Sequence, residues 1–288
     1  MSGPARAVEA ACRGLLGAAP TAVHLLRDSP TATVCRVTIP GRAAPLVVKA
    51  WVGRAAWKAH KERLALTALA GATGFGVPWV VAAGPVPGWD AAAVAVTDAG
   101  PDTLAGLEAA GHCTRPQVLA RLGRLLAAFH AHQPPPPGPM LGPAGVEAMA
   151  EDLRAHLPAG APAQLRRALE GAVALTRHAP VVWCHGDLHP HNVLQPPGGR
   201  PQLIDFELSA LAPPEWDAAQ TLVTADALSP DQQELVLDAY GLPLDMELLG
   251  HLVVVHALRG WRWAAFAEGV DTALWEARLR AALSDYLT

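Results

Sequence analysis

Apolar and polar positions divide the chain into a strand-rich first third and a helical remainder. Before residue 98, short runs rich in β-branched residues are separated by turn-forming residues, a pattern that predicts strands. Residues 54–69 contain no proline or glycine and are rich in alanine and leucine, which predicts a helix. A short helix is also expected at the start of the chain, over residues 5–18. The expected strands cover residues 23–26, 34–39, 46–51, 79–83 and 92–97.

Beyond residue 98 the apolar residues recur at helical spacing. Val118, Leu122, Leu125 and Phe129 follow one another at intervals of three or four, which predicts a helix with one buried face. Residues 133–145 hold six prolines and are expected to form a stiff surface linker. The remaining expectations are helices over 102–110, 115–132, 145–157 and 162–178, a strand over 181–184, a hairpin over 193–204, and four or five helices over 216–288.

These elements predict an α+β fold with two lobes. We expect an N-terminal lobe over residues 1–97, with a five-stranded antiparallel sheet and one main helix. A mostly helical C-terminal lobe over residues 98–288 would carry the hairpin. The chain has 288 residues, of which 51% are hydrophobic and 17% charged, so both lobes can bury a core and wholesale disorder is excluded.

The composition also narrows the partners and the compartment. The net charge of −4 lacks the large basic excess of a general nucleic-acid binder. The four cysteines are far apart in the sequence, which argues against a zinc site or a disulfide framework and favours a cytoplasmic protein. Glu9 and Arg13 interrupt any signal peptide, and prolines with Asp90 interrupt the apolar residues 77–96, so no membrane association is expected.

Charge is distributed unevenly along the chain. Residues 1–98 carry ten basic and five acidic side chains, whereas residues 211–288 carry four basic and twelve acidic ones. One interpretation is an anion-binding surface in the first lobe and a cation-binding surface in the last helices. The alternative is that these charges only solvate helix faces.

The strongest chemical signal is the segment His185-Gly186-Asp187-Leu188-His189-Pro190-His191-Asn192, followed by Ile204-Asp205-Phe206-Glu207. A buried strand delivers a loop with Asp187 and Asn192, and a turn-linked strand delivers Asp205 beside it. Carboxylate and amide oxygens in small number suit Mg²⁺ shared with substrate phosphates. An acidic group that does not bind the metal is available as a base.

This arrangement resembles the catalytic loop and metal-binding aspartate of protein kinases. The form found here is most similar to the aminoglycoside phosphotransferase and choline kinase-like family, and the resemblance extends over most of the chain, including Leu126–His130. It implies a protein kinase-like fold and ATP-dependent transfer of the γ-phosphate to a hydroxyl group. In that mechanism Asp187 would be the catalytic base, and Asn192 with Asp205 would hold Mg²⁺.

The same resemblance implies a nucleotide site in the first lobe. Lys49 is the only one of three lysines in an expected strand, and it would contact phosphates unless it is an edge-strand lysine facing water. Glu62 would orient Lys49, although an i,i+4 pair with Lys58 is the alternative. Ser29 lies in a glycine-free loop over residues 27–33 that is either a phosphate loop or an ordinary hairpin turn. By position, Thr97 and Asp98 would contact the adenine.

Three further residues are expected to support the catalytic loop. His185 and His189 would brace it rather than act as bases. Asp217 would cap the next helix and brace the same loop. His191 stands where the family often has glycine, which is the one departure within this motif.

The acceptor is expected to be a small molecule. Only nine residues separate Asp205 from Glu215, which leaves no room for a long peptide-binding segment. The acidic C-terminal part suits a cationic or sugar-like acceptor such as an aminoglycoside or amino sugar, with the acidic and aromatic candidates Glu215, Trp261, Trp263 and Glu268. The tryptophans would stack on a sugar ring or an amine, unless they only pack in the core.

Several alternatives fit the same sequence. A choline or sugar kinase is one, and antibiotic resistance, sugar salvage and choline metabolism are all compatible with the motif. A catalytically silent, nucleotide-binding regulator with a kinase-like fold is another, favoured only by the glycine-free loop. A metal centre built on His185, His189 and His191 is the weakest. The protein is expected to be a monomer or homodimer.

Overall fold

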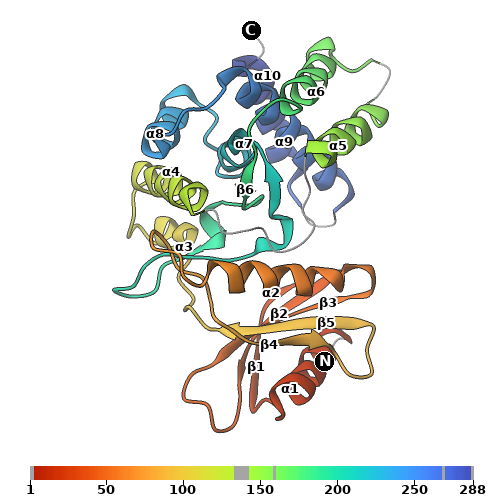
Figure 1. The fold of residues 1–288 in the computed structure, drawn as a ribbon, viewed down its shortest axis with the longest axis vertical. Helices are drawn as coiled ribbons and strands as arrows, with labels where there is room; N and C mark the ends of the chain where they lie inside the picture. The colour runs from red at the N-terminus through yellow and green to blue at the C-terminus, as the bar shows by residue number, and fades with distance from the viewer. Residues whose placement is uncertain (1–2, 133–142, 158–159, 268–269, 287–288) are drawn as a thin grey trace. The chain divides into compact units, whose positions relative to one another are not determined.

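The computed structural model describes residues 3–132, 143–157, 160–267 and 270–286 (Figure 1). The chain forms two compact units. Among the described residues, unit 1 contains 3–102 and 194–207, and unit 2 contains the others. The expected linker over 133–145 lies mostly outside the described residues.

Unit 1 is built around a five-stranded antiparallel sheet in the order β1-β2-β3-β5-β4. Its strands are β1 (Ala22–Asp28), β2 (Ala32–Thr38), β3 (Leu46–Val52), β4 (Val80–Pro85) and β5 (Ala91–Thr97). In the register of β3 with β5, Lys49 lies opposite Val94 and Val48 opposite Ala95. The predicted sheet and its succession of strand, strand, strand, helix, strand, strand are confirmed.

Two helices cover opposite faces of this sheet (Figure 1). The helix α1 (Gly3–Leu16) packs on one face, where Cys12 lies with Val48 and Ala50 in a buried cluster. The helix α2 (Trp57–Leu69), which follows the short turn η1 (Gly53–Ala55), packs on the other face against Trp51. Because side chains alternate along a strand, Lys49 and Trp51 share the α2 face, opposite to Val48 and Ala50. Because of this alternation, the one lysine in a strand lies on the face of the sheet that α2 covers.

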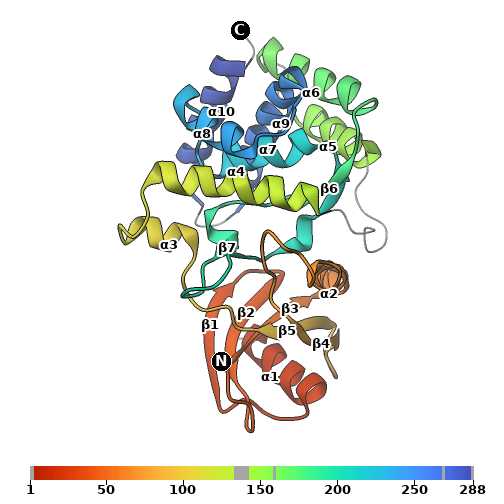
Figure 2. The same cartoon turned by 60° about the vertical axis from the view of Figure 1, so that its left-hand side comes forward.

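Unit 2 is mainly helical (Figure 2). The helix α4 begins with a capping box in which Thr114 and Gln117 bond reciprocally, and its predicted apolar face is buried, with Val118, Leu122 and Phe129 fully enclosed. The apolar helix α9 packs against α6, α7 and α10. The helices are α3 (Leu104–Ala109), α4 (Arg115–Ala131), α5 (Pro143–Ala155), α6 (Ala163–Thr176), α7 (Pro214–Thr224), α8 (Pro230–Tyr240), α9 (Met246–Phe266) and α10 (Thr272–Tyr286).

A short two-stranded sheet supports the loop between residues 185 and 192. The strand β6 (Val182–Cys184) pairs antiparallel with β9 (Ala210–Ala212), so that Cys184 lies opposite Ala210. Strand β6 is expected from its apolar sequence, whereas β9 is not, because its sequence Ala-Leu-Ala contains no β-branched or aromatic residue. The predicted hairpin corresponds to β7 (Val193–Leu194) and β8 (Gln202–Leu203).

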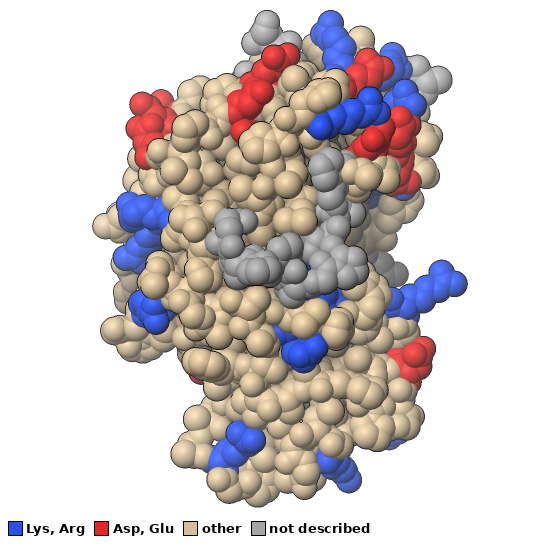
Figure 3. Space-filling model, in the orientation of Figure 1, with Lys and Arg blue, Asp and Glu red and all other residues tan. Residues whose placement is uncertain are grey.

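No helix in the described part of the chain combines the length and apolar character needed to cross a membrane. On the face drawn in Figure 3, charged side chains form small separate groups on a mostly uncharged surface, and acidic groups at the top of the view lie beside basic ones.

Candidate active site

The loop of residues 185–192 in unit 2 follows directly from the buried strand β6. Gly186 has a φ of 78°, a left-handed conformation that favours glycine. A Cβ atom at this position would lie 2.1 Å from the carbonyl oxygen of Leu208. The glycine of the motif is therefore required by the backbone, and the loop turns here to present the next residue, Asp187.

The buried carboxylate of Asp217 holds the start of this loop. Its two oxygens accept hydrogen bonds from the backbone N–H groups of His185 and Gly186, each at 2.6 Å. Nε2 of His130 lies 3.1 Å from the same carboxylate, and its Nδ1 lies 2.9 Å from the hydroxyl of Tyr240. The helix α7 begins at Pro214, so Asp217 stands inside its first turn, and the expected N-cap role is wrong. The brace on the loop has the expected geometry.

The carboxylate of Asp187 is fixed by two amide donors. Its Oδ1 accepts a hydrogen bond from Nε2 of Gln220 at 2.9 Å, and its Oδ2 accepts one from Nδ2 of Asn192 at 3.1 Å. Nε2 of His189 lies 3.6 Å from Oδ2. The side chain of Asp187 is 23% exposed, so its carboxylate is accessible from solvent while its orientation is set by these partners.

Asn192 and the two histidines complete this half of the site. The amide nitrogen of Asn192 also donates to the backbone oxygen of Asp187 at 2.9 Å. The amide oxygen is the atom of this side chain that could bind a metal ion. His185 is buried, and its Nδ1 accepts the N–H of Asp187 at 3.3 Å. Nδ1 of His189 accepts the N–H of His191 at 3.3 Å, at the start of the short helix η2 (Pro190–Asn192). His185 and His189 thus both accept hydrogen bonds from backbone N–H groups of the loop, which is the geometry expected of residues that brace it.

In unit 1, Lys49 lies among three carboxylates. It forms ion pairs with Asp205 and, at 3.4 Å, with Glu207, and its ammonium lies 4.6 Å from the ring centre of Trp51. Burial favours the neutral amine, but the charges of Glu62, Asp205 and Glu207 outweigh it and raise the pKa of Lys49 above its ordinary value. Lys49 is therefore a fixed positive charge, and the alternative of a lysine facing water is wrong.

The direct Lys49–Glu62 ion pair expected from the sequence is absent among the described residues, because Asp205 and Glu207 occupy the ammonium. Lys58 pairs with Glu207 at 3.1 Å, so the i,i+4 alternative is not formed either. Glu62 is 6% exposed, and burial raises its pKa to about 7 despite the opposing charge of Lys49. Glu62 therefore has no direct contact with Lys49 among the described residues, and it influences the pKa of Lys49 only when its carboxyl group is ionised.

Asp205 reaches Lys49 because of an unusual backbone conformation. Its φ is 69°, in the left-handed region that aspartate and asparagine tolerate better than most residues. Arg27 contributes a second cation, 3.7 Å from Oδ2 of Asp205. Of the two expected metal ligands, Asp205 belongs to unit 1 and Asn192 to unit 2. The contacts given for each are therefore contacts with residues of the same unit.

The remaining first-lobe candidates have intramolecular partners. Ser29 Oγ donates to the carbonyl of Ala32 at 2.9 Å and accepts its N–H at 3.0 Å, which closes the turn between β1 and β2. Thr97 Oγ1 accepts the N–H of Trp79 at 2.9 Å. Asp98 pairs with Arg36 through two nitrogens, at 2.5 and 3.2 Å. Roles for Ser29, Thr97 and Asp98 in binding a nucleotide stay predictions.

The four acceptor candidates are placed differently from one another. Glu215 is 4% exposed, and its Oε1 accepts the N–H of Asp245 at 2.7 Å, so this carboxylate holds the start of α9. Trp263 is 54% exposed and lines a pocket, whereas Trp261 is partly buried and lies outside the lining. Glu268 lies outside the described residues. Of the four, Trp263 is the one that lines the described pocket, and roles for all four in binding an acceptor stay predictions.

Within the described residues, the one group with metal-ligand spacing is His130, Cys184 and Asp217. The hydrogen bonds of His130 and Asp217 described above already use their ligand atoms, so this cluster is a structural network. The group does not contain His185, His189 or His191, which leaves the histidine metal centre without support.

Residues 27–252 match the model of the phosphotransferase enzyme family, APH. The chain belongs to this family. Membership confirms the recognition made from the catalytic loop and the expected class of enzyme, a small-molecule kinase. A comparison with curated proteins gives no match.

Solved structures with this fold include three kinds of phosphotransferase. The GDP complex of aminoglycoside 2'-phosphotransferase-IIIa is 15% identical, with 99% of each chain covered and a TM-score of 0.69. Choline kinase LicA from Streptococcus pneumoniae is 17% identical, covering 99% of this chain and 100% of its own, with a TM-score of 0.69. Spectinomycin phosphotransferase APH(9)-Ia, in complex with ADP and spectinomycin, is 14% identical, with coverages of 96% and 93% and a TM-score of 0.60. These likenesses confirm the protein kinase-like fold.

Sequence reasoning missed three residues of this phosphotransferase. Glu207 lies two positions after the expected metal ligand Asp205, within the same motif, but the motif assigns it no role. Gln220 stands three positions after Asp217, a spacing that becomes informative once both lie on one helix. Arg259, a pocket-lining residue whose pKa is influenced by the charge of Asp187, follows that aspartate by more than seventy residues, and no local sequence pattern connects the two. The first two had a detectable signal in the sequence, and the third had none.

Proposed function

We propose that this phosphotransferase transfers the γ-phosphate of ATP to a hydroxyl group of a small molecule. The observation that carries the proposal is the fixed, partly exposed carboxylate of Asp187, held by Gln220 and Asn192 on the loop that the family motif marks. The charged cluster around Lys49 in unit 1 supports it, because phosphates need a permanent cation.

Nucleotide binding is supported from two sides. The spectinomycin enzyme is in complex with ADP and the aminoglycoside 2'-phosphotransferase with GDP, and both share this fold. In this chain Lys49 carries a positive charge at every physiological pH, and Arg27 adds another beside Asp205. We assign Lys49 to the phosphates, with Asp205 and Glu207 as the paired carboxylates that keep it charged.

The donor set fits Mg²⁺. The carboxylate of Asp205 and the amide oxygen of Asn192 are hard oxygen ligands of the kind that Mg²⁺ prefers. We assign both to the metal, which when bound would neutralise charge on the phosphates. The left-handed backbone at Asp205 fits this role, since it turns the carboxylate out of the strand direction.

The transfer needs one proton to move within the protein. Asp187 accepts the proton of the acceptor hydroxyl, the hydroxyl oxygen forms a bond to the γ-phosphorus, and the bond from that phosphorus to the β,γ-bridging oxygen breaks to release ADP. Asn192 and Gln220 keep the carboxylate aimed at the hydroxyl. Most of the rate acceleration then comes from position and charge, as in other phosphoryl transfers.

The substitution Asp187→Asn tests the proposal. The variant keeps the size of the side chain but cannot take a proton, so we expect turnover to fall by about 10²–10⁴-fold while the affinity for ATP changes less than about twofold. ADP release would be measured with Mg-ATP across sugars, amino sugars, choline-like amines and hydroxy acids. The exposed Asp231→Asn on α8 is the matched control.

Two outcomes would contradict the proposal. Full activity of Asp187→Asn would remove Asp187 from the role of base. ATP binding without turnover of any acceptor by the wild-type protein would favour the silent regulator instead.

A further inference from the structure

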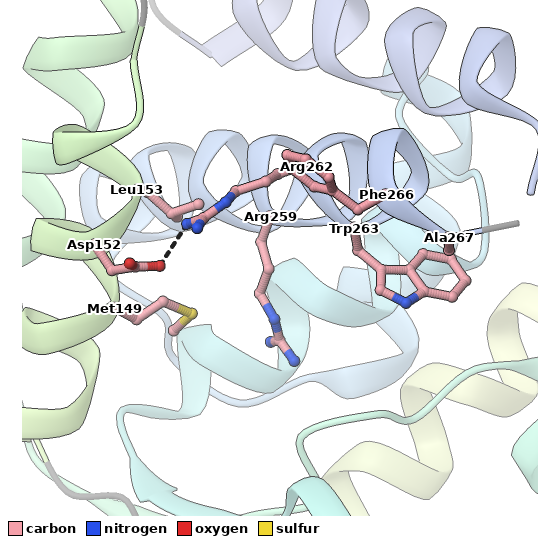
Figure 4. Close-up of a pocket in the computed structure, with 8 residues that line it drawn as sticks. All are labelled: Met149, Asp152, Leu153, Arg259, Arg262, Trp263, Phe266 and Ala267. Carbon is pink, nitrogen blue, oxygen red and sulfur yellow. Dashed lines mark hydrogen bonds and ion pairs between the residues drawn. The ribbon is translucent and has the colours of Figure 1, made fainter. Parts of the chain in front are cut away.

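Unit 2 contains a pocket of about 480 Å³ between α5 and α9 (Figure 4). Its walls are partly apolar and partly charged. The lining residues are Met149, Asp152, Leu153, Arg259, Arg262, Trp263, Phe266 and Ala267. A volume of this size admits a small molecule.

The charges in this pocket do not cancel. Arg262 forms an ion pair with Asp152, drawn as a dashed line in Figure 4. Arg259 has no hydrogen bond or ion pair to any described residue, and Figure 4 shows its side chain extending from α9 away from that pair. Arginine stays protonated in proteins, so one positive charge in the pocket lacks a partner.

Arg259 lines the pocket and is also within electrostatic range of the catalytic loop. Burial lowers the pKa of Arg259, and among the described residues the charge that counteracts this effect is that of Asp187. The guanidinium is therefore partly shielded from water and interacts electrostatically with the carboxylate of Asp187. A ligand group held by Arg259 would bring the rest of a small molecule near the proposed base.

The aromatic wall of the pocket favours a ligand with a ring or an apolar part. Trp263 is 54% exposed and Phe266 is 84% exposed, which is unusual for side chains of this size. The ring of Trp263 lies edge-on to Trp275, with 6.3 Å between ring centres, so a neighbouring side chain orients it. An aromatic surface held in this way is suited to stacking on a flat or cyclic ligand.

The acidic charge of the C-terminal part lies elsewhere. None of the described acidic residues after position 210 lines the pocket, and the charged residues that this part contributes are Arg259 and Arg262. Several of the acids have structural partners: Asp217 holds the loop, Asp245 caps α9 and Asp226 pairs with Arg278 at 3.1 Å. The charge excess that favoured a cationic acceptor therefore does not describe this pocket.

We propose that the acceptor of this phosphotransferase carries a carboxylate in addition to its hydroxyl, and that Arg259 binds that carboxylate. The inference rests on the proposed function and names the substrate class for the same reaction. One unpaired guanidinium matches one carboxylate, because the two groups form parallel hydrogen bonds. An ammonium group at the same place would meet a like charge in a partly desolvated setting.

The test uses two sets of probes that differ in one charged group. The first set is 4-(hydroxymethyl)benzoate, its amide 4-(hydroxymethyl)benzamide and the amine 4-(hydroxymethyl)benzylamine. The second is glucuronate, glucose and glucosamine. Binding to the full-length protein would be measured by titration calorimetry, and turnover by ADP release with Mg-ATP. We expect the carboxylate of at least one set to bind about tenfold or more tightly than its neutral partner.

Variants assign the preference to a residue. In Arg259→Gln the preference for the carboxylate should fall to within about threefold, because the charge-assisted hydrogen bonds are lost. Arg259→Lys should keep part of it. Arg167→Gln, on the exposed side of α6, removes the same charge outside the pocket and should keep all of it.

The outcomes separate the inference from the proposed function. Equal binding of the three charge states in both sets, or a preference for the amines, would overturn the inference even if ADP were released from another acceptor. A carboxylate preference that depends on Arg259 would support it. If that preference appeared without any ADP release, the anion site would stand and the proposed phosphotransfer to its ligand would be wrong.

Discussion

Individual charged residues in unit 1 depend on one another for their protonation states. Glu62 is buried without a direct ion pair among the described residues, and Lys49 keeps its charge because several carboxylates surround it. The pKa of Glu207 is shifted in the opposite direction to that of Glu62. Burial works against its charged form, but Lys49, Lys58 and the indole N–H of Trp51 outweigh it, so the pKa of Glu207 is lowered. Two glutamates near the same lysine therefore differ in charge around neutral pH.

The raised pKa of Glu62 predicts a pH-dependent stability. The folded protein holds a proton on Glu62 up to about pH 7, whereas the unfolded chain releases it near the ordinary glutamate pKa of 4.5. Stability should therefore decrease as the pH rises through this window, by at most about 3 kcal/mol. Urea unfolding of the wild type and of Glu62→Gln at pH 5.5 and 8 measures this. The neutral variant should lose most of that dependence.

Glu234→Gln serves as the control, because Glu234 is exposed on α8 and should not alter the pH dependence. If Glu62→Gln and the wild type lost the same stability between the two pH values, Glu62 would be charged in the folded protein throughout.

At the scale of elements, α7 organises the catalytic loop. Asp217, Gln220 and Thr221 occupy positions i, i+3 and i+4, so they share one face of the helix. They bind the loop at three places: the N–H groups of His185 and Gly186, the carboxylate of Asp187 and, at 3.0 Å, the carbonyl of Leu188. One helical turn therefore determines the conformation of four consecutive loop residues.

This arrangement predicts that Gln220 is a positioning residue. In Gln220→Glu the side chain keeps its shape but loses the N–H donor and adds a negative charge beside Asp187. We expect kcat to fall by about 10–100-fold while the KM for ATP changes less than about twofold. Steady-state kinetics would measure both constants.

The matched control is Gln232→Glu, which makes the same chemical change on α8. A rise in the KM for ATP without a fall in kcat would show that Gln220 does not act through Asp187.

The element scale also shows how far the sequence could be interpreted. The five strands and α4 followed from periodicity, because each has one face on a core. The loop from His185 to Asn192 was recognisable because its spacing is set by local chemistry. By contrast, the choice of Asp205 and Glu207 over Glu62 as partners of Lys49 depends on side-chain positions more than 140 residues apart in sequence. Such choices are made by tertiary packing and leave no local pattern.

At the scale of the whole molecule, charge is organised by unit. Unit 1 brings Lys49, Lys58 and Arg27 to the carboxylates of Asp205 and Glu207. In unit 2 the cation of the described pocket that has no direct ion pair with a described residue is Arg259. A sum of charges along the sequence predicts a basic first lobe and an acidic C-terminal part, but it cannot distinguish a buried acid such as Glu215 from a surface one.

Binding of Mg-ATP should stabilise the whole fold. A ligand at one hundred times its Kd adds about 2.7 kcal/mol to the free energy of unfolding. We expect ATP with Mg²⁺ to raise the melting temperature by several degrees more than ATP with EDTA, in a thermal denaturation experiment. Asp205→Asn should lose this metal-dependent increment, since asparagine tolerates the left-handed backbone but lacks the charge.

Asp231→Asn should keep the increment. An undiminished effect of Mg²⁺ on Asp205→Asn would remove Asp205 from the metal site.

The brace from α7 has a consequence for the speed of catalysis. Ordering the backbone of a residue costs about 1–2 kcal/mol of conformational entropy. For residues 185–188 this loss occurs when the polypeptide folds, because Asp217, Gln220 and Thr221 already restrict them without any bound substrate. Each encounter with an acceptor thus begins from an ordered loop, and the entropy of arranging the proposed base does not add to the activation barrier.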